Sequence, residues 1–289
     1  MVRVDAEPLD RIVSLPCWSG RVDPVPLVGG ITNKNYLVAD RGEKFVVRLG
    51  TDIPIHGVMR FNELAASRAA FEAGISPEVI HAEPGALVLR FIDGRTLTSE
   101  LMREPALLRQ AVDIVKRCHE RIPHTLRSPA LMFWVFQVIR GYAAELRAQR
   151  SRYAELVPEL VERATRLERD TGPVTIVFGH NDLLAANFID DGKRLWLIDW
   201  DYAGFNSPLF DLGGLVSNSD LDARFVLERY FGRVNVDLEL RFAAMKCASL
   251  LREAMWSMVS EIHSTLPFDY AAYTSEYLAR FRRAYAEFE

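Results

Sequence analysis

The chain has 289 residues, which is long for one core and suits two lobes that share an interface. Hydrophobic residues make up 49% of it and charged residues 26%, as is ordinary for a soluble globular enzyme. The net charge of −4 comes without a visible basic face, which argues against nucleic-acid binding, and no stretch approaches the roughly 18 apolar residues of a membrane span.

The cysteines and the N-terminus favour a cytoplasmic protein. The three cysteines are widely spaced and form no C-x-x-C pair, so we expect isolated reduced thiols. The first residues include acids and prolines where a signal peptide would need an apolar run.

The first ninety-odd residues are predicted to be mostly β structure with one inserted helix. Apolar stretches of strand length are separated there by Gly-containing turns, and a helical pattern occurs once, closed by Gly74. The expected elements are three strands within 25–49, a helix over 60–74, and two short strands over 77–82 and 86–92.

The remaining residues are predicted to be mainly helical. Leu, Ala, Arg and Glu recur at helical spacing over 98–170, β signals return only within 174–200, and the rest from about 208 is helical again. We therefore predict an α+β fold with two lobes and a ligand cleft between them. The β-rich N-terminal lobe is expected over residues 1–93, the helical C-terminal lobe over 94–289, and a hinge near Asp93-Gly94.

The strongest functional signal is the segment from His180 to Asn187, which follows an apolar strand. It matches the H-x-D-L-x-x-x-N pattern of kinase catalytic loops. In that chemistry Asp182 accepts or orients the proton of the attacking hydroxyl, and Asn187 reaches a metal ion on the ATP phosphates. The alternative is a solvated turn. His180 is expected to be a structural, hydrogen-bonded histidine.

A second signal follows one hairpin later. The apolar strand that ends at Ile198 delivers Asp199 to the place where kinases have the metal-binding aspartate of D-F-G. Here the triplet is Asp199-Trp200-Asp201. A lone carboxylate at a strand end is commonly a turn former. Following the catalytic-loop pattern, Asp199 predicts a Mg²⁺ ligand together with Asn187.

A third signal lies in the N-terminal lobe. Arg48 ends a predicted strand where kinases have the lysine that holds the α- and β-phosphates, and Glu63 lies on the next helix, where kinases have its carboxylate partner. The planar guanidinium of arginine suits phosphate oxygens. The alternative is an exposed arginine at a strand end.

The segment 29–35 is predicted to lie over the ATP phosphates. Its Gly-Gly pair could supply backbone N–H donors close to an anion. The alternative is a plain hairpin turn. The candidate nucleotide-binding residues in it are Gly30, Thr32, Asn33 and Asn35.

Together these motifs resemble the choline/ethanolamine kinase family, within the aminoglycoside phosphotransferase-like superfamily. The similar segments run in the family's order from about residue 25 to 215, and they include GGITNKNYLV, KFVVRLG, LVLRFIDGRTL, FGHNDLLAANFI and LWLIDWDYAGFNSPLFDLG. The resemblance implies a protein-kinase-like fold, ATP and Mg²⁺ as cofactors, and transfer of the γ-phosphate to the hydroxyl of choline or ethanolamine. It also implies that Asp211 braces the catalytic loop.

Past residue 215 the similarity is confined to possible substrate residues. Trp256 and Tyr273 resemble the aromatic walls of the family's choline pocket, whereas Glu253 stands where some members have a second aromatic residue. Choline has no N–H donor, so ring faces and carboxylates must hold it. We therefore predict that Trp256, Tyr273, Asp201 and Asp182 contact the acceptor. The alternative for each aromatic residue is a place in the core.

Other readings stay open. The acceptor could be another hydroxylated amine, such as an aminoglycoside or thiamine. The chain could also be a pseudokinase that serves as a binding module, although Asp182, Asn187 and Asp199 argue against this. A small amino alcohol is the expected partner, and a monomer or homodimer the expected assembly.

Overall fold

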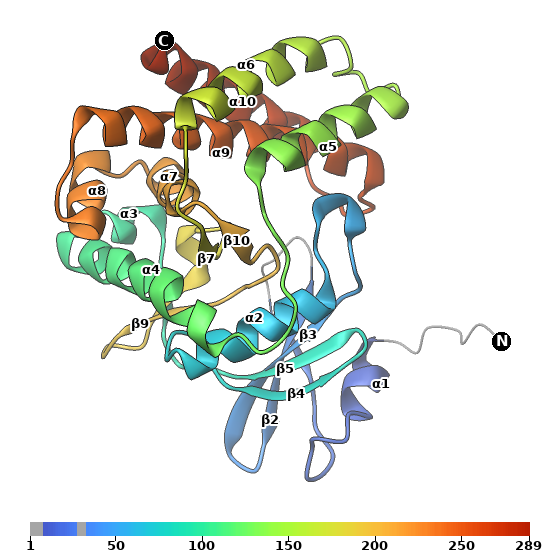
Figure 1. Cartoon of the computed structure of the whole chain (residues 1–289). Coiled ribbons are helices and arrows are strands. Elements are labelled where there is room, and N and C mark those ends of the chain that lie inside the picture. Colours follow the sequence, from blue (N-terminus) through green and yellow to red (C-terminus); the bar gives the residue numbers. More distant parts are fainter. Residues whose placement is uncertain (1–7, 28–32) are drawn as a thin grey trace.

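The computed structural model describes residues 8–27 and 33–289, which form a β-sheet lobe and a helical lobe (Figure 1). The N-terminal lobe is built on an antiparallel sheet with the strand order β1-β2-β3-β5-β4. Its strands are β1 (Val25–Leu27), β2 (Lys34–Asp40), β3 (Glu43–Leu49), β4 (Val79–Glu83) and β5 (Ala86–Arg90). Helix α1 (Pro8–Val13) contributes Ile12 to a core with buried residues of β2, β3 and β5.

The alternation of side chains along β3 positions Arg48. Successive side chains of a strand point to opposite faces of the sheet, and Phe45 and Val47 belong to the core that Ile12 completes. Arg48 therefore projects from the other face. Asn35 of β2 lies opposite Arg48 in the strand register.

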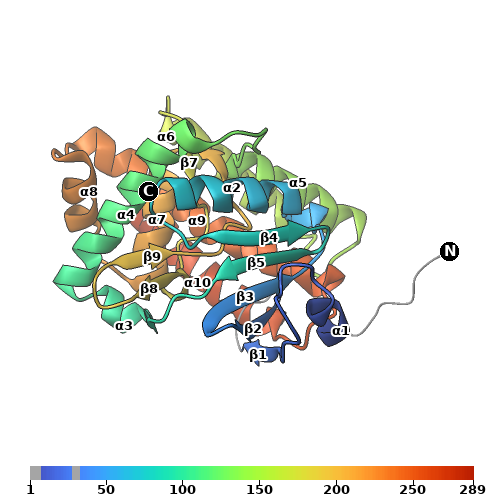
Figure 2. The same ribbon diagram turned by 90° about the horizontal axis from the view of Figure 1, so that it is seen from below.

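Helix α2 (Arg60–Glu72) runs beside β4 and reaches the helical lobe (Figure 2). Gly74, with a φ of 72°, follows its last turn and confirms the predicted end of the helix. Near its start, the buried amide of Asn62 donates to the carbonyl of Ala203 at 2.7 Å and accepts from the N–H of Leu131 at 2.9 Å. One side chain thus joins α2 to the backbone of the helical lobe.

The C-terminal lobe is organised around α9 (Val236–His263), a helix of 28 residues. It contacts α5, α6, α7 and α10 and is buried on most of its faces, as expected for a helix at the centre of a bundle. The other helices are α3 (Ser99–Met102), α4 (Pro105–Thr125), α5 (Val135–Ala148), α6 (Val157–Thr171), α7 (Pro208–Ser219), α8 (Ala223–Phe231) and α10 (Tyr270–Phe288).

Within the described residues, two small sheets and two 3₁₀ turns complete the secondary structure. One sheet pairs β7 with β10, and the other has the order β6-β8-β9. These elements are β6 (Arg95–Thr96), β7 (Val177–Gly179), β8 (Phe188–Asp190), β9 (Leu195–Leu197), β10 (Gly204–Asn206), η1 (Pro54–His56) and η2 (Ala185–Asn187).

Gly94 precedes β6 and lies close to β8. A Cβ at this position would lie 2.7 Å from the carbonyl oxygen of Asp190, so the close approach of β6 to β8 requires glycine. The lobe boundary between residues 93 and 94 stays a prediction.

The predicted α+β, protein-kinase-like arrangement is confirmed. The short helix α1 was not predicted, and β8 and β9 are shorter than expected, at three residues each. All three cysteines are free thiols. Within residues 8–27 and 33–289, no helix combines the length and apolar character needed to cross a membrane.

Candidate active site

Asp211 fixes the catalytic loop, as the family resemblance implied. It lies in the first turn of α7 and is buried. Its carboxylate accepts the backbone N–H of His180 at 2.8 Å and that of Asn181 at 2.7 Å, and it bonds Nε2 of His119 at 2.8 Å. Burial alone would raise the pKa of Asp211, but the hydrogen bond and charge of His119 keep it below its usual value.

His180 is a structural residue, as predicted. Its ring is buried, with Nε2 2.9 Å from the carbonyl oxygen of Ile198 and Nδ1 3.3 Å from the backbone N–H of Asp182. This pattern places the proton on Nε2, so that Nδ1 can accept. Burial lowers the pKa of His180. The neutral ring thereby ties the catalytic loop to the segment that carries Asp199.

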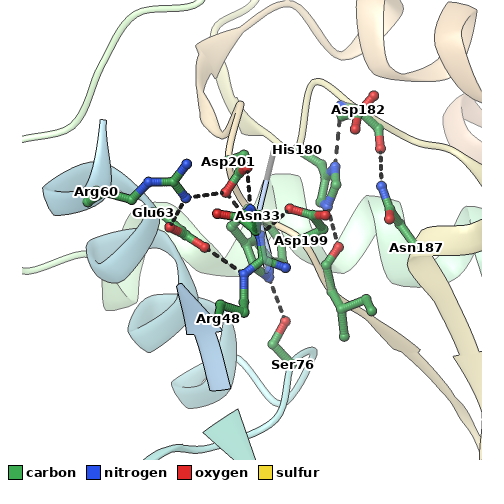
Figure 3. A network of polar contacts seen from close by, with 12 residues as sticks. Asn33, Arg48, Arg60, Glu63, Ser76, His180, Asp182, Asn187, Asp199 and Asp201 are labelled. Atoms are coloured by element: carbon green, nitrogen blue, oxygen red, sulfur yellow. Dashed lines mark hydrogen bonds and ion pairs between the residues drawn. The ribbon is translucent and has the colours of Figure 1, made fainter. Parts of the chain in front are cut away.

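Asp182 and Asn187 lie together, as their spacing predicted (Figure 3). The Nδ2 of Asn187 donates to the backbone oxygen of Asp182 at 2.8 Å, which leaves the Asn187 amide oxygen to accept another group. Asp182 itself is half-buried. Burial raises the pKa of its carboxyl to about 8, with Arg252 acting in the opposite direction and Glu253 adding to the rise.

Asp199 stands between the catalytic loop and the N-terminal lobe. It follows β9 with a φ of 70°, a left-handed conformation that is uncommon outside glycine. The N–H of Ile198 donates to the carbonyl of Asn187 at 3.0 Å, so Asn187 and Asp199 come from hydrogen-bonded segments. Both offer oxygen atoms, the ligand type that Mg²⁺ prefers.

A buried ion network joins the two lobes (Figure 3). Nε of Arg48 lies 2.9 Å from Glu63, and its Nη2 lies 2.7 Å from Asp199 and 3.0 Å from Asp201. Arg60 lies 2.6 Å from Glu63 and 3.0 Å from Asp201. Burial alone would lower the pKa of Arg48, but the three carboxylates, Asp199 first, raise it well above its usual value.

The charges of this network suit a Mg²⁺ site. Two guanidinium groups face three carboxylates, which leaves one negative charge for a further cation. No group of three or more Asp, Glu, His or Cys residues within the described chain could hold a metal alone. Mg²⁺ is commonly bound through one or two protein oxygens and the substrate phosphates, and Asp199 and Asn187 match that arrangement.

The predicted phosphate loop is described only in part. Gly30 and Thr32 lie outside the described residues. Asn33 donates from Nδ2 to Asp201 at 2.9 Å, and Asn35 lies on β2 opposite Arg48. The end of the loop thus lies at the ion network.

Asp201 belongs to the ion network. It is only 2% exposed, and its carboxylate oxygens face Arg48, Arg60 and Asn33. The two nearby arginines compensate the cost of burying its charge. Its contact with the acceptor stays a prediction.

The rings of Trp256 and Tyr273 are in contact, but the ring of Trp256 is largely buried. It is 6% exposed, its Nε1 donates to the hydroxyl of Tyr202 at 2.9 Å, and its ring packs against Tyr270 and Tyr273. Tyr273 is half-buried and donates its hydroxyl to Glu253 at 2.8 Å. Their role toward the acceptor stays a prediction.

Two arginines of the site were not predicted from the sequence. Arg60 shares Glu63 and Asp201 with Arg48, and its place three residues before Glu63 on one helix was the available signal. Arg252 is buried, pairs with Glu253, and donates to the carbonyl of Asn181 at 3.3 Å. Its signal was an adjacent pair of charges in an apolar helical stretch.

Comparisons with known proteins agree with this geometry. The family model described as choline/ethanolamine kinase matches residues 25–224. Protein LicA of Haemophilus influenzae is 27% identical over 263 residues, covering 86% of this chain and 76% of its own length. The probable ethanolamine kinase of Arabidopsis thaliana is 27% identical over 282 residues, covering 85% of this chain and 75% of its own length.

Solved structures extend the likeness. The choline/ethanolamine kinase family protein from Mesorhizobium loti superposes with a TM-score of 0.75 at 26% identity, covering 95% of this chain and 92% of that one. A thermostable mutant of aminoglycoside phosphotransferase APH(4)-Ia gives a TM-score of 0.69 at 16% identity, covering 92% of this chain and 95% of that one. This likeness shows a shared fold alone. With a family match over more than half of its residues, the chain belongs to the choline/ethanolamine kinase family.

Proposed function

We propose that this chain transfers the γ-phosphate of ATP to the hydroxyl of choline or ethanolamine, with Mg²⁺ bound at Asp199 and Asn187. The observation that carries the proposal is that the catalytic loop, the segment with Asp199 and the Arg48–Glu63 pair lie side by side in the folded chain (Figure 3). The ring of His180 hydrogen-bonds the backbone of Asp182 and that of Ile198, the residue before Asp199. Asp199 in turn pairs with Arg48, which contacts Glu63. Family membership supplies the acceptor class.

Asp182 orients the acceptor hydroxyl. As the hydroxyl oxygen bonds to the γ-phosphorus and the bond to the β-phosphate oxygen breaks, the hydroxyl proton passes to the Asp182 carboxylate. The hydrogen bonds from His180 and Asn181 to Asp211 keep the loop, and with it Asp182, in place. Positioning of this kind accounts for most of what a protein contributes to phosphoryl transfer.

Arg48 binds the phosphates, and Glu63 holds Arg48. The Nε of the guanidinium lies against Glu63, which orients the planar group, while its Nη2 faces Asp199. Gly30, Thr32, Asn33 and Asn35 belong to the loop proposed to cover the phosphates. Asp199 and Asn187 would hold Mg²⁺, which when bound neutralises charge on the β- and γ-phosphates.

The test is turnover with purified protein. ATP, Mg²⁺ and either choline or ethanolamine should give ADP and the phosphorylated alcohol in equal amounts, and D182N should give neither. An aminoglycoside and thiamine serve as competing acceptors, and no observation on the described residues favours them. A pseudokinase would bind ATP and transfer phosphate to none of the four, which would refute the proposal.

A further inference from the structure

A small polar cavity lies directly beside Asp182. Its lining includes the half-buried side chains of Asp182, Asn218, Ser249 and Glu253, together with the buried guanidinium of Arg252. The residues come from the catalytic loop, α7 and α9. The cavity is therefore within reach of a molecule whose hydroxyl contacts Asp182.

The cavity is small. The space in it open to the centre of a water molecule is about 10 Å³, which is room for one group of that size. An ammonium group, one nitrogen with three hydrogens, is close to water in size. A trimethylammonium group carries three methyl groups around the nitrogen and needs several times that space.

The lining offers hydrogen-bond acceptors, among them the carboxyl groups of Glu253 and Asp182. Glu253 accepts from the Tyr273 hydroxyl at 2.8 Å and pairs with Arg252, and its side chain keeps 18% of its surface exposed. When the Asp182 carboxyl is ionised, one guanidinium stands against two half-buried carboxylates, Glu253 and Asp182. Asp211, at the back of the cavity, is already bonded to His119 and to the loop backbone. One positive charge on the acceptor would then neutralise the charge that Arg252 leaves unbalanced on Glu253 and Asp182.

The Arg252 guanidinium is buried, and both of its Nη atoms have partners, whereas its Nε has none among the described residues. Its guanidinium lies over the ring of Tyr202, 4.7 Å from the centroid, and 5.4 Å from the ring centroid of Phe133. Nη1 pairs with Glu253, and Nη2 donates to the carbonyl of Asn181. The side chain is 4% exposed, so a carboxylate on the acceptor would find no forked partner there.

The ring of Trp256 offers little open surface to a quaternary ammonium. A quaternary ammonium needs exposed ring faces, and Trp256 is 6% exposed because His56, Tyr270 and Tyr273 pack around it at centroid distances of 5.6 to 6.1 Å. A primary ammonium needs acceptors instead, and these are what the cavity beside Asp182 presents.

We propose that this cavity binds the ammonium group of the acceptor, and that Glu253 makes the enzyme prefer an amino alcohol with N–H groups, such as ethanolamine, over a trimethylammonium alcohol such as choline. The inference rests on the proposed function. It assigns Glu253 as a residue that determines specificity and Arg252 as the residue that positions it.

The experiment measures kcat/KM for ethanolamine, its N-methyl and N,N-dimethyl derivatives, and choline. The value should fall with each added methyl group and be about tenfold or more lower for choline, since a charged hydrogen bond is lost. E253Q should lower kcat/KM for ethanolamine by about ten- to hundredfold and that for choline much less. E261Q, an exposed change further along α9, should leave the order of acceptors as in the parent.

The outcomes separate the two proposals. If none of the four alcohols is phosphorylated, the proposed function fails. If all are phosphorylated and choline equals or exceeds ethanolamine, the proposed function stands and the inference is wrong. The methylation series on the parent protein decides this even if E253Q does not fold, which a melting curve would reveal. L-Serine, which adds a carboxylate to ethanolamine, should be a poor acceptor, and efficient phosphorylation of it would overturn the assignment of Arg252.

Discussion

Nη2 of Arg48 lies 2.7 Å from the carboxylate of Asp199. The group assigned to the phosphates and the group assigned to the metal therefore bind each other directly, and both must turn to Mg·ATP when it enters. Because Arg48 also holds Glu63 and Asp201, its guanidinium keeps two anionic partners when Asp199 turns to the metal.

Replacing Arg48 by lysine should show what the forked shape contributes. Lysine keeps the charge but cannot contact Glu63 through one nitrogen and Asp199 and Asp201 through another. We expect a KM for ATP raised by about tenfold or more and a lower free energy of unfolding, because buried carboxylates lose partners. Steady-state kinetics and urea unfolding measure both. An unchanged KM for ATP would remove Arg48 from the phosphate site.

Changing Asp182 to Asn should abolish most turnover and leave ATP binding largely intact. The amide keeps the shape of the side chain but cannot take the hydroxyl proton, and loss of such a group costs about 10²–10⁴-fold in rate. The measurements are kcat and calorimetric ATP affinity. A variant that retains more than half of the parent kcat would refute the role of Asp182.

Asp199→Ala should weaken both turnover and productive Mg·ATP binding, because it removes a proposed metal ligand. The half-saturating Mg²⁺ concentration should rise, and added Mg²⁺ should recover part of the rate. Asp191→Ala, in the turn between β8 and β9, is a control that leaves the ion network whole. If D199A shows the parent's rate and Mg²⁺ dependence, Asp199 is only a turn residue.

Trp256→Ala should act mainly on stability. The ring is enclosed, so its removal should lower the free energy of unfolding by about 3–5 kcal/mol and weaken choline and ethanolamine to a similar extent. Thermal melting and KM for both acceptors test this. A selective loss of choline affinity with little change in melting temperature would instead confirm the prediction from the sequence that Trp256 contacts the acceptor.

Stability should fall in mild acid because of His56. Its ring nitrogens lie 3.0 Å from the Tyr142 hydroxyl and 3.0 Å from the Ser260 hydroxyl. Burial, and to a lesser degree the charges of Arg252 and His263, lower the pKa of His56 to about 3. An unfolded histidine titrates near 6.5, so below that pH the unfolded chain binds one more proton, and about 1.4 kcal/mol of stability is lost per pH unit until the folded pKa is reached.

Urea unfolding at pH 7 and pH 5 measures this loss. His56→Gln should reduce the difference between the two values by about 2 kcal/mol, whatever it does to the absolute stability. His124→Gln, at an exposed position, is the matched control and should keep the parent's difference. Equal pH dependence in the parent and the His56 variant would contradict the prediction.

The parts of the site that the sequence predicted are those fixed by short-range geometry. Asp182 and Asn187 lie on one loop after a strand, and Arg48 ends a strand whose alternation determines its face. Asp201 could not be placed in this way, because the left-handed φ of Asp199 redirects the chain just before it. Its partners Arg48 and Arg60 are 153 and 141 residues away in sequence, so only the folded structure reveals the pairing.

The amide of Asn62 has a mechanical consequence. Because both ends of this side chain are bonded to the backbone at Ala203 and Leu131, a displacement of α2 away from the helical lobe must break both hydrogen bonds. Glu63 is the next residue on the same helix. Asn62 therefore anchors to the helical lobe the very turn of α2 that supplies the carboxylate partner of Arg48.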